Sequence, residues 1–346
     1  MIDGRYSRQE LFHKIGIEGQ QKLSQKHVLI IGAGALGTGS AEVLARAGVG
    51  TITLVDRDYV EFSNLQRQQL FSEEDARQHL PKAVAAKQRL MQINSEVNIR
   101  AIVMDVTAQE IEELASGVNV IIDATDNFET RMIINDIAQK RSIPWIYGAC
   151  VGSYGLTYTF IPGHASPCLN CLLESIPMGG ATCDTVGVIA SVVQMVNAYQ
   201  TAEALKILVE DWQALHGKLI SFDLWSNQHT AMNVESLKNS ACLSCGAQST
   251  YPYLENDSPI RTAVLCGRDT VQIRPSVSMQ LNLQDAAASL ALQGGKVEVN
   301  PYMVSYSTSK HRLAIFQDGR VLVHGTKDSE EAKSLYRRYM GLFSEI

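Results

Sequence analysis

Short apolar runs alternate with segments of helical length over the first 150 residues of the chain. Five runs have the length and the β-branched content of buried strands: 27–31, 51–56, 98–103, 118–124 and 144–149. Four segments between them have the spacing of helices: 37–48, 81–94, 108–115 and 127–141. Strands that alternate with helix-length connections predict a parallel sheet with helices on both faces.

The pattern changes in the second half of the chain. Residues 152–161 alternate between apolar and polar side chains and predict an antiparallel continuation of the sheet, and a long helix follows near 189–208. Near the C-terminus, helices are expected at 283–293 and 329–340. A turn-rich stretch separates that region from the rest. We therefore predict a main α/β domain, a linker and a small α+β domain: 1–246, 247–260 and 261–346.

Composition and charge narrow the range of functions. The chain has 346 residues, of which 45% are hydrophobic and 19% charged, and its formal net charge is -6. Such a chain offers no basic surface for nucleic acid. No export signal and no apolar run of about 18 residues is visible, so we expect a soluble, cytoplasmic protein that does not cross a membrane.

A glycine-rich turn joins the first predicted strand to the first helix. Gly32, Gly34 and Gly37 form the pattern GxGxxG, and Asp56 ends the next strand. Glycines allow the tight turn, the close approach of phosphate and the packing of the helix, while the aspartate can bind ribose hydroxyls. These residues predict an adenosine ligand on a Rossmann-like, mostly parallel sheet, but they do not distinguish NAD from ATP.

The polar residues that follow favour phosphate chemistry over hydride transfer. Asn64 and Arg67 are close enough along the chain to face one ligand. Lys82 lies in the first turn of a predicted helix, where a cation is unfavourable unless an anion binds there; a solvated surface lysine is the alternative. Asp126 and Asn127 follow a central strand, where ligands of such sheets bind. Asp126 fits either a Mg²⁺ ligand or a helix N-cap.

Five cysteines are candidates for metal binding or reactivity. Two CxxC pairs, Cys168 with Cys171 and Cys242 with Cys245, have the spacing of a closed tetrahedral Zn²⁺ site; two unrelated thiol pairs are the alternative. Cys183 lies in a loop before the long helix, whose N-terminus would lower the pKa of a thiol. It is either a reactive residue or a bystander.

Several motifs together resemble the ThiF/MoeB family, the bacterial relatives of ubiquitin-activating enzymes. They are RYSRQ, GAGALG, DRDYVEFSNLQRQ, LPKA, DATDNFETR and the two CxxC pairs, in order over residues 4–246. The resemblance implies a homodimer that uses MgATP to adenylate the C-terminal glycine of a ubiquitin-like sulfur-carrier protein. The carrier would serve thiamine or molybdopterin synthesis, with a cysteine desulfurase or another sulfur donor as a further partner.

The resemblance also implies roles for individual residues. Asp56 would hold the ribose, and Asp126 the Mg²⁺ ion. Asn64, Arg67 and Lys82 would contact the phosphates.

Three further residues have roles that rest on the resemblance alone. Arg131 would lie close to the tail of the carrier, and Arg8 would enter the site of the neighbouring subunit. Cys183 matches a cysteine implicated in a covalent acyl-disulfide with the carrier in ThiF-like members. Two other interpretations of the chain stay open: an NAD-dependent oxidoreductase and a non-catalytic, zinc-stabilised protein that binds the carrier.

Overall fold

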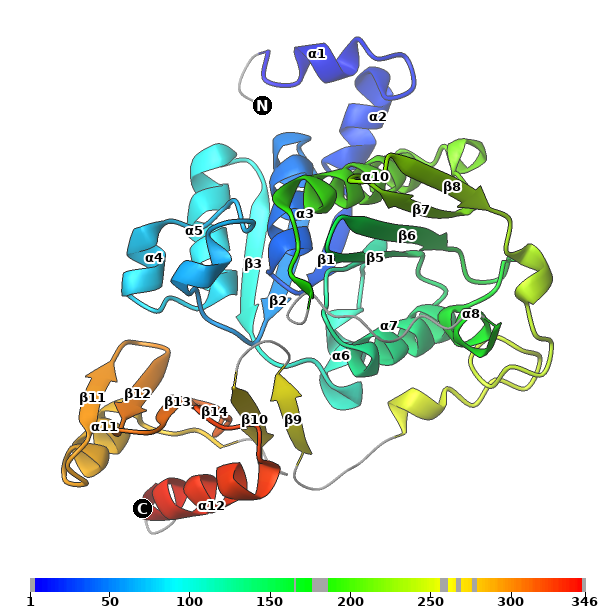
Figure 1. The fold of residues 1–346 in the computed structure, drawn as a ribbon. Helices are drawn as coiled ribbons and strands as arrows, with labels where there is room; N and C mark the ends of the chain where they lie inside the picture. The colour runs from blue at the N-terminus through cyan, green and yellow to red at the C-terminus, as the bar shows by residue number, and fades with distance from the viewer. Residues whose placement is uncertain are drawn as a thin grey trace. The chain divides into compact units, whose positions relative to one another are not determined.

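The computed structural model describes residues 4–164, 166–175, 186–255, 269–275 and 279–343, and the backbone of 261–265. The chain divides into two compact units. The first unit comprises residues 1–180 and 188–256, and the second unit comprises residues 181–187 and 257–346 (Figure 1).

One mixed sheet forms the centre of the first unit. In the described part of this unit the strand order is β3-β2-β1-β4-β5-β6-β7-β8. The neighbours from β3 to β5 pair in parallel, and those from β5 to β8 are antiparallel. The strands are β1 (His27–Ile31), β2 (Thr51–Asp56), β3 (Asn98–Val103), β4 (Val120–Asp123), β5 (Trp145–Val151), β6 (Tyr154–Phe160), β7 (Leu219–Asp223) and β8 (Gln228–Met232). The predicted Rossmann-like sheet with an antiparallel continuation is confirmed.

Helices cover both faces of this sheet (Figure 1). On one face, Val28 and Ile30 of β1 pack with α3 (Ala35–Arg46), α5 (Lys82–Ile93) and α10 (Ala190–Leu208). On the other face, Leu29 and Ile31 pack with α6 (Ala108–Leu114), α7 (Phe128–Arg141) and α8 (Leu169–Ser175). Side chains that alternate along a strand reach both faces, so a strand covered on both sides is apolar throughout.

Shorter helices complete the first unit. They are α1 (Ser7–Glu10), α2 (Gly16–Leu23), α4 (Glu73–Arg77) and the 3-10 helices η1 (Phe62–Asn64), η2 (Trp212–Ala214), η3 (Glu235–Leu237) and η4 (Pro252–Leu254). In η4, the backbone N–H of Tyr253 donates to Asp136 of α7 at 2.9 Å. The first residues of the predicted linker are therefore anchored to the first unit. No described helix combines the length and the apolar composition that a membrane crossing requires.

The second unit contains an antiparallel sheet and two longer helices. In its described part the strand order is β11-β12-β13-β14-β10-β9. The strands are β9 (Arg261–Leu265), β10 (Thr270–Arg274), β11 (Lys296–Val299), β12 (Met303–Ser307), β13 (Arg312–Phe316) and β14 (Val321–His324). The helices are α11 (Leu283–Ala291), α12 (Ser329–Met340) and η5 (Gly341–Phe343), and the two longer ones share a core with the strands. The predicted α+β character of this region is confirmed.

Candidate active site

The glycine-rich turn lies where the strand order of the sheet changes direction. β1 pairs with β2 on one side and with β4 on the other, and ligands of open α/β sheets bind at the carboxyl ends of the strands at such a point. Gly32 has a φ of +100°, and a Cβ atom there would lie 2.4 Å from the carbonyl oxygen of Ala124. A Cβ atom at Gly37 would lie 1.8 Å from the carbonyl oxygen of Gly32. Close packing of the backbone therefore requires both glycines.

Gly34 has a different role, because the space in front of it is open. A Cβ atom at this position would meet only the Nε2 atom of Gln68, at 3.9 Å. Gly34 is the N-cap of α3, and no side chain of a described residue caps this helix. An uncapped helix N-terminus with open space before it fits a phosphate group, since its backbone N–H groups carry partial positive charge. The residues present at this turn therefore fit a nucleotide phosphate.

Asp56 stabilises this turn from the carboxyl end of β2. Its Oδ2 atom accepts a hydrogen bond from the backbone N–H of Ala33, and its Oδ1 atom accepts one from the N–H of Asp58, both at 2.6 Å. Burial raises the pKa of Asp56, and the nearby Lys82 acts in the opposite direction. Each carboxylate oxygen keeps a second lone pair, so the side chain can still accept hydrogen bonds from ribose hydroxyls.

Lys82 is buried at the first position of α5. Only 5% of the surface of Lys82 is exposed, and its Nζ atom lies 3.0 Å from Oδ2 of Asp58. The alternative of a solvated surface lysine is therefore wrong. A buried ammonium at a helix N-terminus is unfavourable by itself, and Asp58 offsets part of that cost.

Asn64 and Arg67 lie together in the turn around η1. Asn64 is buried and its Oδ1 atom accepts a hydrogen bond from the backbone N–H of Glu61 at 3.0 Å. Arg67 donates from Nη1 to the carbonyl oxygen of Ser63 at 3.1 Å. Both side chains are thus held by their own turn, which fixes the position of the Asn64 amide and of the Arg67 guanidinium.

The structure distinguishes between the two predicted roles of Asp126, a helix N-cap and a Mg²⁺ ligand. Asn127 is the N-cap of α7, because its Oδ1 atom accepts a hydrogen bond from the backbone N–H of Thr130 at 2.9 Å. Asp126 is not needed for this bond; its side chain is 74% exposed, and a carboxylate oxygen lies 3.7 Å from Arg57. The N-cap reading of Asp126 is wrong. An exposed carboxylate at the end of a central strand fits a Mg²⁺ ligand.

Arg131 is held inside the first unit. Its Nε atom donates to Oδ2 of Asp123 at 2.9 Å, and its Nη2 atom donates to the carbonyl oxygens of Thr125 and Gly148. Burial lowers the pKa of Arg131, but the attraction of Asp123 outweighs that effect and raises the pKa above its ordinary value. The described contacts of Arg131 therefore connect the carboxyl end of β4 to the middle of β5, and its contact with a carrier stays a prediction.

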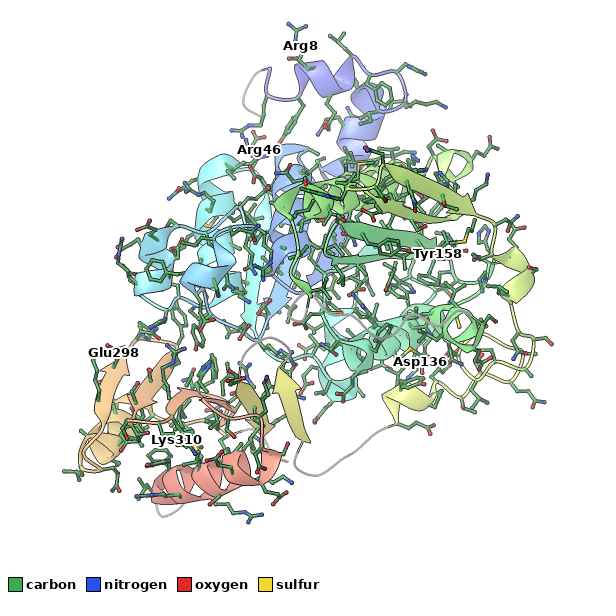
Figure 2. All side chains as sticks on the ribbon, viewed as in Figure 1. Arg8, Arg46, Asp136, Tyr158, Glu298 and Lys310 are labelled. Atoms are coloured by element: carbon green, nitrogen blue, oxygen red, sulfur yellow. The ribbon has the colours of Figure 1, made fainter. Side chains whose placement is uncertain are left out.

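Arg8 lies on exposed helix α1, at the opposite end of α3 from the glycine-rich turn. Tyr6 is buried and accepts a hydrogen bond from Asn94 at 2.8 Å, and Gln9 donates to the carbonyl oxygen of Ala47 at 2.9 Å. Ala47 directly follows α3, whereas the glycine-rich turn precedes it. A 12-residue helix is about 18 Å long, so Arg8 is far from the nucleotide turn of its own chain (Figure 2).

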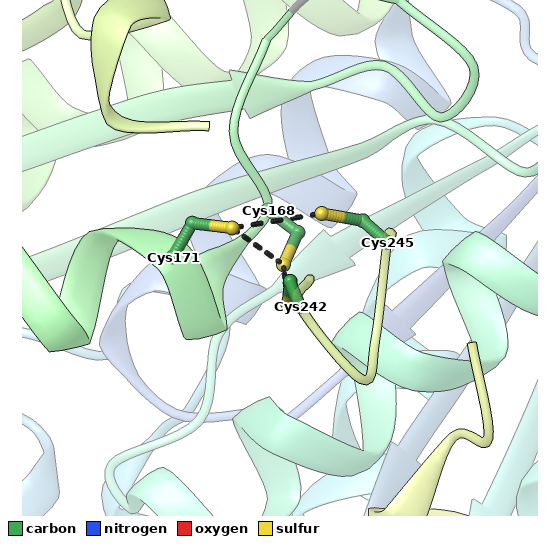
Figure 3. A group of neighbouring side chains, drawn as sticks. All are labelled: Cys168, Cys171, Cys242 and Cys245. Atoms are coloured by element: carbon green, nitrogen blue, oxygen red, sulfur yellow. Dashed lines mark hydrogen bonds between the residues drawn. The ribbon is translucent and has the colours of Figure 1, made fainter. Parts of the chain in front are cut away.

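The four cysteines of the CxxC pairs come together in the first unit (Figure 3). Their sulfur atoms lie within 4.8 Å of one another. The distances are 3.8 Å from Cys168 to Cys171, 3.7 Å from Cys168 to Cys242 and 3.6 Å from Cys171 to Cys245. Four sulfurs bound to one zinc at about 2.3 Å in a tetrahedron lie about 3.8 Å apart. A disulfide would need about 2.05 Å. The cluster therefore fits a Zn²⁺ ion.

The thiols of the cluster differ in pKa. Burial raises the pKa of Cys171 to about 11, whereas hydrogen bonding with Cys168 lowers the pKa of Cys245 to about 5. The backbone N–H of Asn239 donates to the sulfur of Cys171, and that of Ser244 donates to the sulfur of Cys242, both at 3.4 Å. A divalent cation would stabilise the four thiolates together.

Two buried polar residues of α7 connect this helix to the first CxxC turn and to η4. Asn135 accepts a hydrogen bond from the backbone N–H of Leu169, which lies between Cys168 and Cys171, at 2.9 Å. Asp136, labelled in Figure 2, accepts a hydrogen bond at 2.9 Å from the backbone N–H of Tyr253 in η4, which follows the second CxxC pair in sequence. Sequence reasoning missed both residues, because a polar residue within a helix is usually exposed.

Metal analysis should find close to one Zn²⁺ per chain. The Cys242→Ser variant should lose zinc and melt about 5 °C or more below the wild-type chain, because the site joins two distant segments. ATP affinity should fall only as far as the fold is lost. Cys150→Ser is the matched control, since Cys150 lies outside the cluster, and it should keep its zinc. A well-folded wild-type chain without zinc would contradict the assignment.

Not every predicted residue can be placed. Cys183 lies outside the described residues, so its role stays a prediction. The sequence did not predict that Gln68, whose Nε2 atom lies close to Gly34, is buried at this site. It belongs to the same polar run as Asn64 and Arg67, but a glutamine among polar residues gives no sign that it is buried.

Comparisons with known proteins identify the family of this chain. The sequence model of the ThiF family matches residues 6–244 of this chain. The chain is 52% identical over 341 residues to the sulfur carrier protein ThiS adenylyltransferase of Bacillus subtilis, which covers 98% of this chain and 100% of that protein. It is 33% identical to the molybdopterin-synthase adenylyltransferase of Salmonella typhimurium, over 70% of this chain and 96% of that protein. A crystal structure of E. coli MccB with ATP has a TM-score of 0.61 and 24% identity over 70% of this chain and 75% of that chain, which supports the fold alone.

Proposed function

Because this chain belongs to the ThiF family, we propose that its nucleotide turn serves the adenylation of a ubiquitin-like sulfur-carrier protein. A carboxylate oxygen of the carrier's C-terminal glycine attacks the α-phosphorus of ATP. The bond from that phosphorus to the bridging oxygen of pyrophosphate breaks, so the products are the carrier acyl-adenylate and pyrophosphate. The single observation that carries the proposal is the open, uncapped N-terminus of α3 at Gly34.

The residues around this turn supply what the reaction needs. The attack brings two anions together, so the barrier falls when fixed positive groups stabilise the charge on the phosphate oxygens. Lys82 and Arg67 provide positive charge, and Asn64 provides an amide donor. Asp56 orients the ribose. A Mg²⁺ ion held by Asp126 would neutralise part of the phosphate charge when it is bound.

We further propose that the carrier protein serves thiamine synthesis rather than molybdopterin synthesis. What supports it is the 52% identity to a ThiS adenylyltransferase over nearly the whole chain, including the region beyond residue 244. The molybdopterin-synthase relative matches over 70% of the chain. We therefore propose a ThiS-like carrier as the substrate, with a cysteine desulfurase or another donor supplying the sulfur.

A homodimer is also part of the proposal. Leu11, Phe12 and Ile17, close to Arg8 in sequence, expose more than half of their surfaces, and an exposed apolar cluster of this kind is typical of an interface. A dimer that covers them would bring Arg8 into a neighbouring chain. We place the protein in the cytoplasm, where reducing conditions keep zinc-binding thiols free of disulfides.

Mass spectrometry of a ThiS-like and a MoaD-like carrier, each incubated with the enzyme and MgATP, tests the proposal. The ThiS-like carrier should gain one adenylyl group, and the MoaD-like carrier should react more slowly. The Cys183→Ser enzyme should adenylate the carrier at the wild-type rate, because this step needs only phosphate-binding groups. With a sulfur donor added, the wild-type enzyme should form a reducible adduct with the carrier through Cys183.

The controls separate the parts of this proposal. A carrier without its C-terminal glycine should stay unmodified. Failure to modify either intact carrier would contradict the adenylation reaction. Preference for the MoaD-like carrier, or full sulfur transfer by the Cys183→Ser enzyme, would instead favour the molybdopterin branch.

A further inference from the structure

Gln68 is a buried glutamine whose side-chain oxygen has no hydrogen-bond donor among the described residues. The residue is only 4% exposed, and its Oε1 atom has no hydrogen-bond partner among the described residues. Buried polar side-chain atoms are nearly always bonded, because leaving one unbonded loses the hydrogen bonds it made to water. Oε1 is an acceptor, so a phosphate oxygen does not satisfy it; because Oε1 has no donor, the amide is free to turn its Nε2 donor toward a ligand.

The end of this side chain faces the nucleotide turn. Its Nε2 atom lies 3.9 Å from the position that a Cβ atom of Gly34 would occupy, and no other heavy atom lies within 4 Å of that position apart from the glycine and its chain neighbours. The Gln68 amide therefore borders the open space before the uncapped N-terminus of α3. The burial of Gln68 and the opening at Gly34 are independent observations that indicate the same place.

The backbone holds Gln68 at that place. Its N–H donates to the carbonyl oxygen of Asn64 at 3.0 Å, and its own carbonyl oxygen accepts from Phe71 at 3.2 Å. The next residue, Gln69, donates to Glu42 of α3 at 2.8 Å. The segment that bears Gln68 is thus fixed against the same helix whose N-terminus forms the phosphate site. Its amide, in contrast, is not held in one orientation by a bond at Oε1.

We propose that the Gln68 amide is a further phosphate-binding group, which donates from Nε2 to a phosphate oxygen of the nucleotide bound at Gly34. The proposal rests on the nucleotide site of the proposed function and adds a residue to it. A neutral amide binds phosphate without adding charge, so Gln68 fixes the position of the phosphate, while Lys82 and Arg67 balance its charge. A phosphate oxygen would also fix the orientation of the amide.

The affinity of the Gln68→Met enzyme for MgATP, measured without the carrier, tests this role. The dissociation constant should rise about tenfold to a hundredfold, which is the effect of losing one hydrogen bond to a charged group. Affinity for adenosine should not change, because adenosine lacks phosphates. The free enzyme should melt at the wild-type temperature or above it, since methionine has a similar volume and removes an unbonded polar atom.

Gln20 offers a matched control. It is also buried, with 2% of its surface exposed, but its Nε2 atom donates to the carbonyl oxygen of Ala47 at 2.9 Å, at the far end of α3. The Gln20→Met enzyme should melt at a lower temperature and bind MgATP with wild-type affinity. The two glutamines should therefore show opposite effects, one on nucleotide affinity and one on stability.

A third variant separates this inference from the proposed function. Gly34→Val fills the open space and should abolish MgATP binding while the chain still folds, because φ at this position is -80°. If Gly34→Val binds MgATP normally, the nucleotide site itself is misassigned. If Gly34→Val fails to bind but Gln68→Met binds normally, only the role of Gln68 is overturned. Equal losses of ATP and adenosine affinity by Gln68→Met would overturn it as well.

Discussion

The Lys82→Met enzyme should catalyse carrier-dependent exchange of pyrophosphate into ATP about 100-fold to 1,000-fold more slowly than the wild-type chain. Lys82 is buried, and its ammonium group is fixed by Asp58 at 3.0 Å. An ammonium has three donors, so it can keep this contact while it donates to a phosphate oxygen. Charge on those oxygens is shielded little by water in a buried site, so the loss of one fixed cation is costly.

Stability must be separated from catalysis in this variant. Lys82→Met removes the cation opposite Asp58 and should destabilise the fold, because a buried carboxylate loses its partner charge. The double variant Lys82→Met with Asp58→Asn should recover most of the melting temperature and none of the exchange rate. Lys87→Met, on the same helix, should leave the exchange rate unchanged. Recovery of the rate in the double variant would mean that Lys82 acts through folding alone.

The sequence predicted the strands of the first unit closely. β1, β2 and β3 begin and end at the predicted residues, because each is a run of β-branched and aliphatic side chains bounded by turns or charges. β4 is shorter than predicted, since Val118 and Ala124 are apolar but lie outside the paired segment. Apolar character predicts burial, whereas the limits of a strand depend on its neighbours.

The spacing of the cysteines correctly predicted that they cluster. For the residues of the nucleotide site, however, local spacing did not distinguish between alternative roles. Asp126 and Asn127 can both cap a helix, and only the geometry shows that Asn127 does so. Lys82 could not be distinguished from a surface lysine, because its partner Asp58 lies 24 residues earlier. Gln68 was missed for the same reason: its burial depends on α3, which a local pattern does not contain.

Asn135 and Asp136 were missed because their partners are also distant. They connect α7 to the first cysteine turn and to η4, and the same helix begins directly after Asp126 and Asn127. The cysteine cluster therefore holds the helix whose N-terminus forms part of the candidate active site. A structural zinc site far along the sequence can thus support the nucleotide site without contacting it.

Dimers that contain one Arg8→Ala chain and one Asp126→Ala chain should recover about half of the wild-type activity, although each variant alone is nearly inactive. The Tyr6 and Gln9 contacts hold Arg8 at the end of α3 that lies opposite the nucleotide turn. Arg8 can therefore complete a site only in another chain. One site of the mixed dimer then has both residues, and the other has neither.

Mixed dimers can be purified with a different affinity tag on each chain. Arg46 is a matched control, because it is also exposed near the C-terminal end of α3 and pairs with Glu42 of its own helix; Arg46→Ala alone should stay active. Mixing Arg67→Ala with Asp126→Ala should restore nothing, because both residues belong to the same chain's site. If verified mixed dimers of Arg8→Ala and Asp126→Ala stay as inactive as the single variants, Arg8 does not act across a dimer. Recovery in that pair, with none in the Arg67 pair, would mean that each active site is built from two chains.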